Sequence, residues 1–110
     1  MRALLIRGGG VIEIDVEADN IKDYYHYLEC DIMTSAGYLD ERNAAYVDDN
    51  GLLTLSDGDI VYRVSWYPQP LAGNILILGI DHSDGSTQPC TLTTSEVHDM
   101  LLEIGVVASA

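Results

Sequence analysis

The chain has 110 residues, enough for one globular domain with a single core. Its hydrophobic fraction is 47%, and no apolar run approaches the roughly 20 residues of a membrane span. We therefore expect one cytoplasmic α+β domain over residues 1–105 and a loose tail over 106–110. Eighteen acidic residues against five basic ones give a net charge of −13, which argues against direct binding of nucleic acid or of an anionic membrane.

The N-terminal segment predicts a β-hairpin. Residues 3–6 are apolar, and the glycines at 8–10 let the chain reverse without strain. Residues 11–17 then alternate between apolar and acidic side chains, which is typical of a half-buried strand. The face expected to be buried holds Ile12, Ile14 and Val16, and the face expected to be exposed holds Glu13, Asp15 and Glu17.

A first helix is predicted after this hairpin. Asp19 or Asn20 can cap it, because a short polar side chain accepts hydrogen bonds from free backbone N–H groups. We expect the helix to end near Glu29 and residues 31–39 to form a short strand. The apolar side chains at helical spacing are Ile21, Tyr24, Tyr25 and Leu28.

The middle of the chain predicts further strands. Asn50-Gly51 favours a type I′ turn between strands at 46–48 and 52–53. Residues 60–67 alternate like a strand, which the prolines at 68 and 70 end because proline cannot donate to a sheet. Residues 75–80 form an unbroken apolar run, which indicates a central strand covered on both faces.

A second helix is predicted at the C-terminus. Thr93 and Glu96 have the spacing of a capping box, and Val97, Leu101 and Ile104 would form the buried stripe of a helix that ends at Gly105. The elements lack a regular βαβ rhythm. The sequence thus predicts an α+β fold: a mixed, largely antiparallel sheet of about five to six strands with two helices packed on it.

Three segments carry a resemblance to a known family: YVDDNGLL from residue 46, PLAGNILILGIDHSDG from residue 70, and TLTTSEVHDMLLEIG from residue 91. Their D-x-x-G-x-L turn, P-L-x-G-x-x-x-x-x-G strand and threonine-capped helix resemble a family of small domains of unknown function. That family is found in phages, plasmids and conjugative elements. The resemblance implies an accessory protein of a mobile element inside a bacterial or archaeal host, and it supplies no functional residues.

No motif predicts catalysis, a metal or a cofactor. Cys30 and Cys90 form no CxxC pair and are expected to be free thiols, since cytosolic disulfides are rare. The histidines form neither HExxH nor a zinc finger, and no spacing supports a dyad of Cys90 with His98. Asp81 to Ser86 is better explained as a polar turn than as a metal site. We therefore expect a protein that is not an enzyme.

The acidic strand suggests recognition of a basic partner. Alternate carboxylates on a strand stand about 6.6 Å apart, comparable with successive phosphates of a nucleic acid. This spacing favours a non-enzymatic binding protein that engages a basic surface by nucleic-acid mimicry. With the setting that the resemblance implies, we expect a protein of a phage or mobile element that inhibits a host defence or DNA-processing protein. The predicted contact residues are Glu13, Asp15, Glu17, Asp19, Asp23, Tyr24 and Tyr27.

Two alternatives remain open. One is a protein that binds or sequesters a nucleotide signal, in which tyrosine rings stack on the base and arginines hold the phosphate. Its candidate ligand residues are Arg42, Arg63, Tyr25 and Tyr67. Many such binders are homo-oligomers with pockets between subunits. The other alternative is a salt-adapted domain of halophilic origin, which would lose its fold in low salt.

Overall fold

The computed structural model describes residues 1–51 and 55–107. In chain order, its strands and helices are β1 (Arg2–Arg7), β2 (Gly10–Asp15), α1 (Ile21–Leu28), β3 (Met33–Asp40), β4 (Asn43–Asp48), β5 (Ile60–Val64), β6 (Leu71–Ala72), β7 (Ile75–Ile80), β8 (Thr87–Gln88), α2 (Thr94–Asp99) and β9 (Leu101–Val106).

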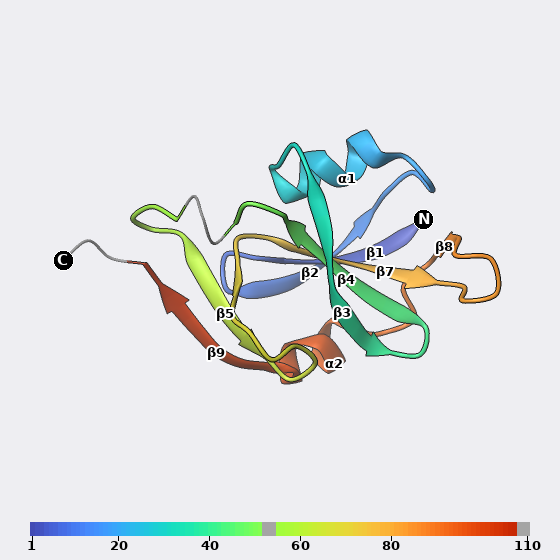
Figure 1. The fold of residues 1–110 in the computed structure, drawn as a ribbon. Coiled ribbons are helices and arrows are strands. Elements are labelled where there is room, and N and C mark those ends of the chain that lie inside the picture. Colours follow the sequence, from blue (N-terminus) through green and yellow to red (C-terminus); the bar gives the residue numbers. More distant parts are fainter. Residues whose placement is uncertain (52–54, 108–110) are drawn as a thin grey trace.

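The strands form two sheets. The larger has six strands in the order β2-β1-β7-β4-β3, with β8 also paired to β7, and the smaller has three in the order β6-β5-β9 (Figure 1). All pairings among the described residues are antiparallel. The largely antiparallel sheet and the two helices of the prediction are therefore confirmed. The second sheet was not predicted, and it makes the fold mainly β.

Strand β7 is the centre of the larger sheet, as its apolar sequence predicts. It lies between β1 and β4, with Leu76 opposite Leu5 and Ile77 opposite Ala45. Residues 75–78 are at most 1% exposed. Both faces are covered because α1 packs on one side, while the smaller sheet and α2 lie on the other (Figure 1).

The two sides of the larger sheet hold separate core clusters. Beneath α1, Tyr24 and Leu28 pack with Val16 and Leu76. The opposite cluster joins the two sheets and α2, and its members include Leu4, Ile6, Tyr62, Val64, Ile77 and Val97. Strand β7 contributes side chains to both clusters, so both layers pack against the same strand.

The predicted hairpin and first helix are confirmed. Gly8 and Gly9 have φ of 59° and 84° in the turn between β1 and β2, a conformation that glycine adopts without strain. The Asn20 side chain caps α1 by accepting from the N–H of Lys22 at 3.1 Å. Glu29 ends the helix in the left-handed conformation.

One part of the predicted buried face of β2 is exposed. Val16 is buried and Ile14 partly buried against the cluster under α1, whereas Ile12 is 49% exposed. Ile12 pairs with Leu5, nearer the hairpin turn, and the α1 cluster does not reach it. The short helix therefore covers less of the sheet than the alternation predicts.

The predicted second helix is wrong beyond its first turns. The capping box of Thr93 and Glu96 is present, but α2 ends at Asp99 and residues 101–106 form β9, paired with β5. The apolar residues of this segment fit a helical period and also an alternating one, so a short run could not decide between them. Pairing with the open edge of β5 decides in favour of the strand, a tertiary effect.

The remaining boundaries differ less. Residues 31–39 were predicted as a strand and contain most of β3, while β5 ends at Val64, earlier than predicted. Val106 and Val107 do not belong to a loose tail, since the Val107 N–H donates to the Asp59 carbonyl at 2.8 Å. The second strand of the predicted Asn50-Gly51 hairpin lies almost wholly outside the described residues. No helix in the described ranges has the length and apolar character to cross a membrane.

Candidate interaction surface

The carboxylates all lie at the surface. None of the eighteen Asp and Glu residues is buried, and Asn43 is the one buried polar side chain among the described residues. The described part of the chain shows three ion pairs. Among the described residues, most of the eighteen carboxylates therefore form no ion pair.

The predicted acidic stripe, formed by Glu13, Asp15 and Glu17, is partly neutralised by cations of the same chain. Glu13 pairs with Arg2, and Asp15 accepts from the N-terminal ammonium at 2.6 Å. The Arg2 guanidinium is also held by the carbonyls of Cys90 and Leu92, at 2.8 and 2.7 Å. Two of the three carboxylates thus face cations, so β2 does not present a regular row of free negative charges.

The sequence contains a signal for this neutralisation. A two-residue turn at Gly8-Gly9 sets Arg7 opposite Gly10, and the resulting register places Arg2 opposite Asp15. Glu13 then lies diagonally across from Arg2, within reach of a long side chain.

The predicted carboxylates of the β2–α1 connection lie together. Asp23 accepts from the Glu17 N–H at 2.8 Å, and Glu17 accepts from the Asn20 side chain at 2.9 Å. Asp19 accepts from the Thr87 hydroxyl at 2.8 Å. These bonds order the connection and still leave Glu17 and Asp19 exposed.

The predicted tyrosines of this surface differ in exposure. Tyr24 is 3% exposed, and its hydroxyl accepts from the Asp19 N–H at 2.8 Å, so its ring belongs to the core and is not a contact residue. Tyr27 is half-buried and donates to the Asp15 carbonyl at 3.4 Å. Only Tyr27 of this pair could contribute to a partner interface.

Several other carboxylates shape turns, as predicted for the 81–86 turn. In each of these turns, an aspartate side chain accepts a hydrogen bond from the backbone N–H two residues later. The four aspartates are Asp40, Asp48, Asp81 and Asp84. Hydrogen bonds from the Ser86 backbone and hydroxyl lower the pKa of Asp84. In the described ranges no group of side chains could hold a metal ion.

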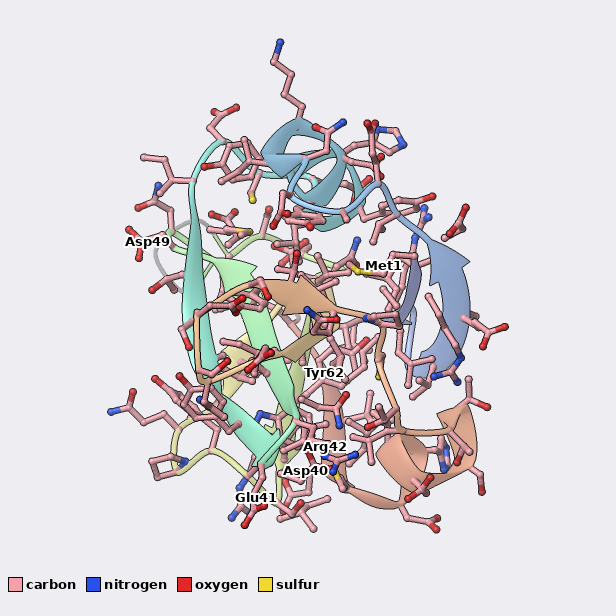
Figure 2. All side chains as sticks on the ribbon, turned by 90° about the vertical axis from the view of Figure 1, so that its right-hand side faces the viewer. Met1, Asp40, Glu41, Arg42, Asp49 and Tyr62 are labelled. Atoms are coloured by element: carbon pink, nitrogen blue, oxygen red, sulfur yellow. The ribbon has the colours of Figure 1, made fainter. Side chains whose placement is uncertain are left out.

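Five carboxylates have no such internal role. Within the described chain their side chains accept no hydrogen bond and join no ion pair, and they are Asp31, Glu41, Asp49, Asp57 and Asp99. Figure 2 shows Glu41 at the β3–β4 turn, beside Asp40 and Arg42, with Asp49 well away from it. The free negative charge is therefore spread over the molecule.

The four residues of the nucleotide-binding alternative do not form one site. Tyr25 lies on α1, on one side of the larger sheet, while Arg63 lies on β5 on the other side and pairs with Glu103 at 2.9 Å. Arg42 lines a cavity of about 510 Å³, which Tyr25 and Tyr67 do not reach. That cavity also contains Glu41 and Asp81, whose charges oppose an anionic ligand.

A second cavity lies between the β1–β2 turn and the smaller sheet. It measures about 370 Å³ and has Arg7 on its wall, with Asp48, Asp59 and Glu29 as acidic neighbours. Tyr62 also lines it, and burial raises the pKa of this phenol, which therefore stays neutral at physiological pH. The acidic walls again disfavour a phosphate.

The sequence did not predict the apolar edge formed by β9. Leu102, Ile104 and Val106 are 57%, 47% and 68% exposed. Their spacing of two residues was the available signal, but the helical prediction assigned Ile104 to a buried stripe.

The fold and this surface define a mainly antiparallel β domain with two short helices and an acidic exterior. Residues 1–102 match the family described as "Domain of unknown function (DUF3846)", and the chain belongs to this family. No curated protein and no solved structure shows a significant match to the chain.

The motifs behind the resemblance have structural roles. Gly79 lies so close to the next segment that an added Cβ would be 2.3 Å from the Pro89 carbonyl oxygen, and Gly73 has φ of 76°. The Gly51 N–H donates to the Asp48 carbonyl at 3.1 Å in the D-x-x-G turn. These positions are constrained by backbone geometry and do not identify a ligand site.

Proposed function

We propose that this domain is a non-enzymatic binding protein of the cytoplasm whose acidic exterior engages the basic surface of a partner protein. The observation that carries the proposal is the charge distribution: eighteen surface carboxylates against five basic residues, two of which are already paired with carboxylates. Such a field accelerates encounters with a basic partner and repels anionic ones.

The proposed partner is a host defence or DNA-processing protein, and the proposed setting is a phage or other mobile element. The setting rests on the family resemblance of residues 46–102, and the partner class on its need for a basic face. Genes next to members of this family test the setting. Neighbours with anti-defence or replication roles are expected, and neighbours confined to housekeeping metabolism would contradict it.

Nucleic-acid mimicry by β2 alone is not the form that we favour. A mimic needs a regular row of unpaired charges, whereas Glu13 and Asp15 each have a cation of the same chain beside them. The free carboxylates at Asp31, Asp49 and Asp57 lie outside β2. The proposal therefore rests on the field of the whole molecule.

A five-site variant tests the proposal. Asp31, Asp49, Asp57 and Asp99 become Asn and Glu41 becomes Gln, which removes five negative charges without breaking an internal hydrogen bond among the described residues. Against purified basic DNA-binding proteins of the host, measured by biolayer interferometry, we expect the association rate to fall by about tenfold.

A matched control keeps the charge at the same positions. It exchanges Asp for Glu at 31, 49, 57 and 99 and Glu for Asp at 41. Its association rate should stay within about twofold of the original chain, because the net charge is unchanged. Equal rates for the neutralised variant and this control, or no binding to any basic protein at low salt, would contradict the proposal.

A further inference from the structure

Strand β9 is an unprotected sheet edge. The other border strands discourage pairing with a further chain: β2 carries two charged side chains, Glu13 and Asp15, against one in β9, β3 has two register shifts, and β6 and β8 span two residues each. By contrast, β9 spans six residues, contains no proline or lysine, and pairs only with β5 among the described elements. It is therefore the edge best suited to accept another strand.

The backbone of β9 has a free hydrogen-bonding side. The Val107 N–H donates toward β5, to the Asp59 carbonyl at 2.8 Å. Because alternate residues of an antiparallel strand bond to the same neighbour, Gly105 also faces β5, and Ile104 and Val106 direct their N–H and C=O groups away from it. In the described part of the chain, no backbone group meets them on that side.

The side chains of this edge are apolar and half-covered. Ile104 lies opposite Tyr62 on β5, yet Tyr62 is 1% exposed and Ile104 is 47% exposed. Val106 lies opposite Ile60 and is 68% exposed. The inward face of the smaller sheet thus continues as apolar surface up to β9, where the described chain covers it only in part.

Carboxylates surround the same edge. Asp99 lies two residues before β9, Glu103 lies within it, and Asp57 and Asp59 belong to the loop that meets its C-terminal end. The basic residue in this group is Arg63, which pairs with Glu103. A strand docked here would experience a negative potential along its length.

We propose that β9 accepts an extended segment of the basic partner as an additional strand of the smaller sheet. The segment would alternate apolar residues, which cover Ile104 and Val106, with lysine or arginine, which face Glu103 and the flanking carboxylates. This inference rests on the proposed function and specifies how the partner is bound. A second copy of this chain fits less well, because it would bring another net charge of −13 to the same edge.

Hydrogen exchange of single amides gives the most specific test. The probe is a synthetic peptide of alternating valine and lysine, added to the intact chain and followed by NMR. On binding, exchange of the Ile104 and Val106 amides should slow by at least about tenfold, while the Gly105 amide, already bonded to β5, changes little. A control peptide with the same composition and a central proline should bind more weakly, since proline removes a ladder hydrogen bond.

Substitutions separate this edge from the general field. Ile104→Lys should weaken peptide binding by about tenfold, since a charge on an edge strand discourages pairing and removes a central apolar contact. Ile32→Lys is the matched control: Ile32 is 54% exposed, lies outside the smaller sheet, and takes the same change of charge. Its effect should be within about twofold. Val106→Lys repeats the test at a more exposed position, where folding is less at risk.

The outcomes distinguish the two proposals. Strand addition is overturned if Ile104→Lys and Ile32→Lys weaken peptide binding equally and the amides of Ile104 and Val106 are not protected from exchange. That result does not contradict the acidic binding function. No peptide binding even at low salt contradicts both. Protection of the two amides without peptide, together with a concentration-dependent dimer in sedimentation equilibrium, would instead assign β9 to self-association.

Discussion

Asn43 shows how a buried polar residue connects distant parts of the chain. It is fully buried, and its amide donates to Asp40 at 2.9 Å and to the Thr91 hydroxyl at 2.8 Å. Its carbonyl oxygen accepts from the Thr91 N–H at 3.0 Å. All of its polar atoms are satisfied, so the residue ties the β3–β4 turn to the segment before α2.

Asn43→Asp tests this network. A carboxylate cannot donate to Asp40 and would place two negative charges within hydrogen-bonding distance, so we expect unfolding free energy at pH 7 to fall by about 2–4 kcal/mol. Burial and Asp40 would raise the pKa of the new carboxyl, and the loss should shrink as pH falls and the group becomes protonated. Urea denaturation at pH 7 and pH 5 measures both; an unchanged midpoint would contradict the assigned role.

The two cysteines should differ in accessibility and share low reactivity. Cys90 is buried, and burial raises its pKa; Cys30 is half-buried, and burial followed by the Asp48 carboxylate raises its pKa as well. Because the thiolate is the reactive form, native Cys30 should react with iodoacetamide more slowly than an unstructured thiol, and Cys90 only after unfolding. Mass spectrometry of the alkylated chain checks this order, which rapid labelling of native Cys90 would refute.

At the scale of elements, local sequence patterns correctly predicted the starts of both helices and the central strand. The Asn20 cap and the Thr93–Glu96 capping box give helix starts, and the apolar run of β7 gives a central strand. β9 could not be predicted in this way, because its apolar residues suit two periods. Its conformation depends on the open edge of β5, a contact between distant segments that no local pattern encodes.

Gly79→Ala tests the close packing of β7 against the following segment. An added Cβ would lie 2.3 Å from the Pro89 carbonyl oxygen and 2.7 Å from that of Gln88, so the backbone must shift. We expect a loss of about 1–3 kcal/mol in unfolding free energy, measured by urea denaturation. Gly105→Ala, where the nearest atom is 3.9 Å away, is the control and should change stability by about 0.5 kcal/mol or less. Equal effects at both positions would rule out this explanation.

At the scale of the whole molecule, the sequence predicted the acidity and not its arrangement. Arg2 and the N-terminal ammonium neutralise two carboxylates of the predicted acidic stripe. Tyr24, predicted as a contact residue, is buried in the core. The free charges are spread over turns and loops, and the apolar edge of β9 emerged only with the fold. A candidate site composed from separate elements depends on sheet order and register, which composition and periodicity do not specify.

The central claim is that the net negative field drives association with a basic partner. The most direct measurement is the association rate of the intact chain with a basic DNA-binding protein of the host, followed by stopped-flow fluorescence from 50 to 500 mM salt, roughly the range over which screening becomes strong. Circular dichroism at each salt concentration controls for folding and tests the halophilic alternative, which expects unfolding at the low end. We predict a rate that falls steeply as salt increases, with the fold intact throughout. A rate independent of salt would contradict the account.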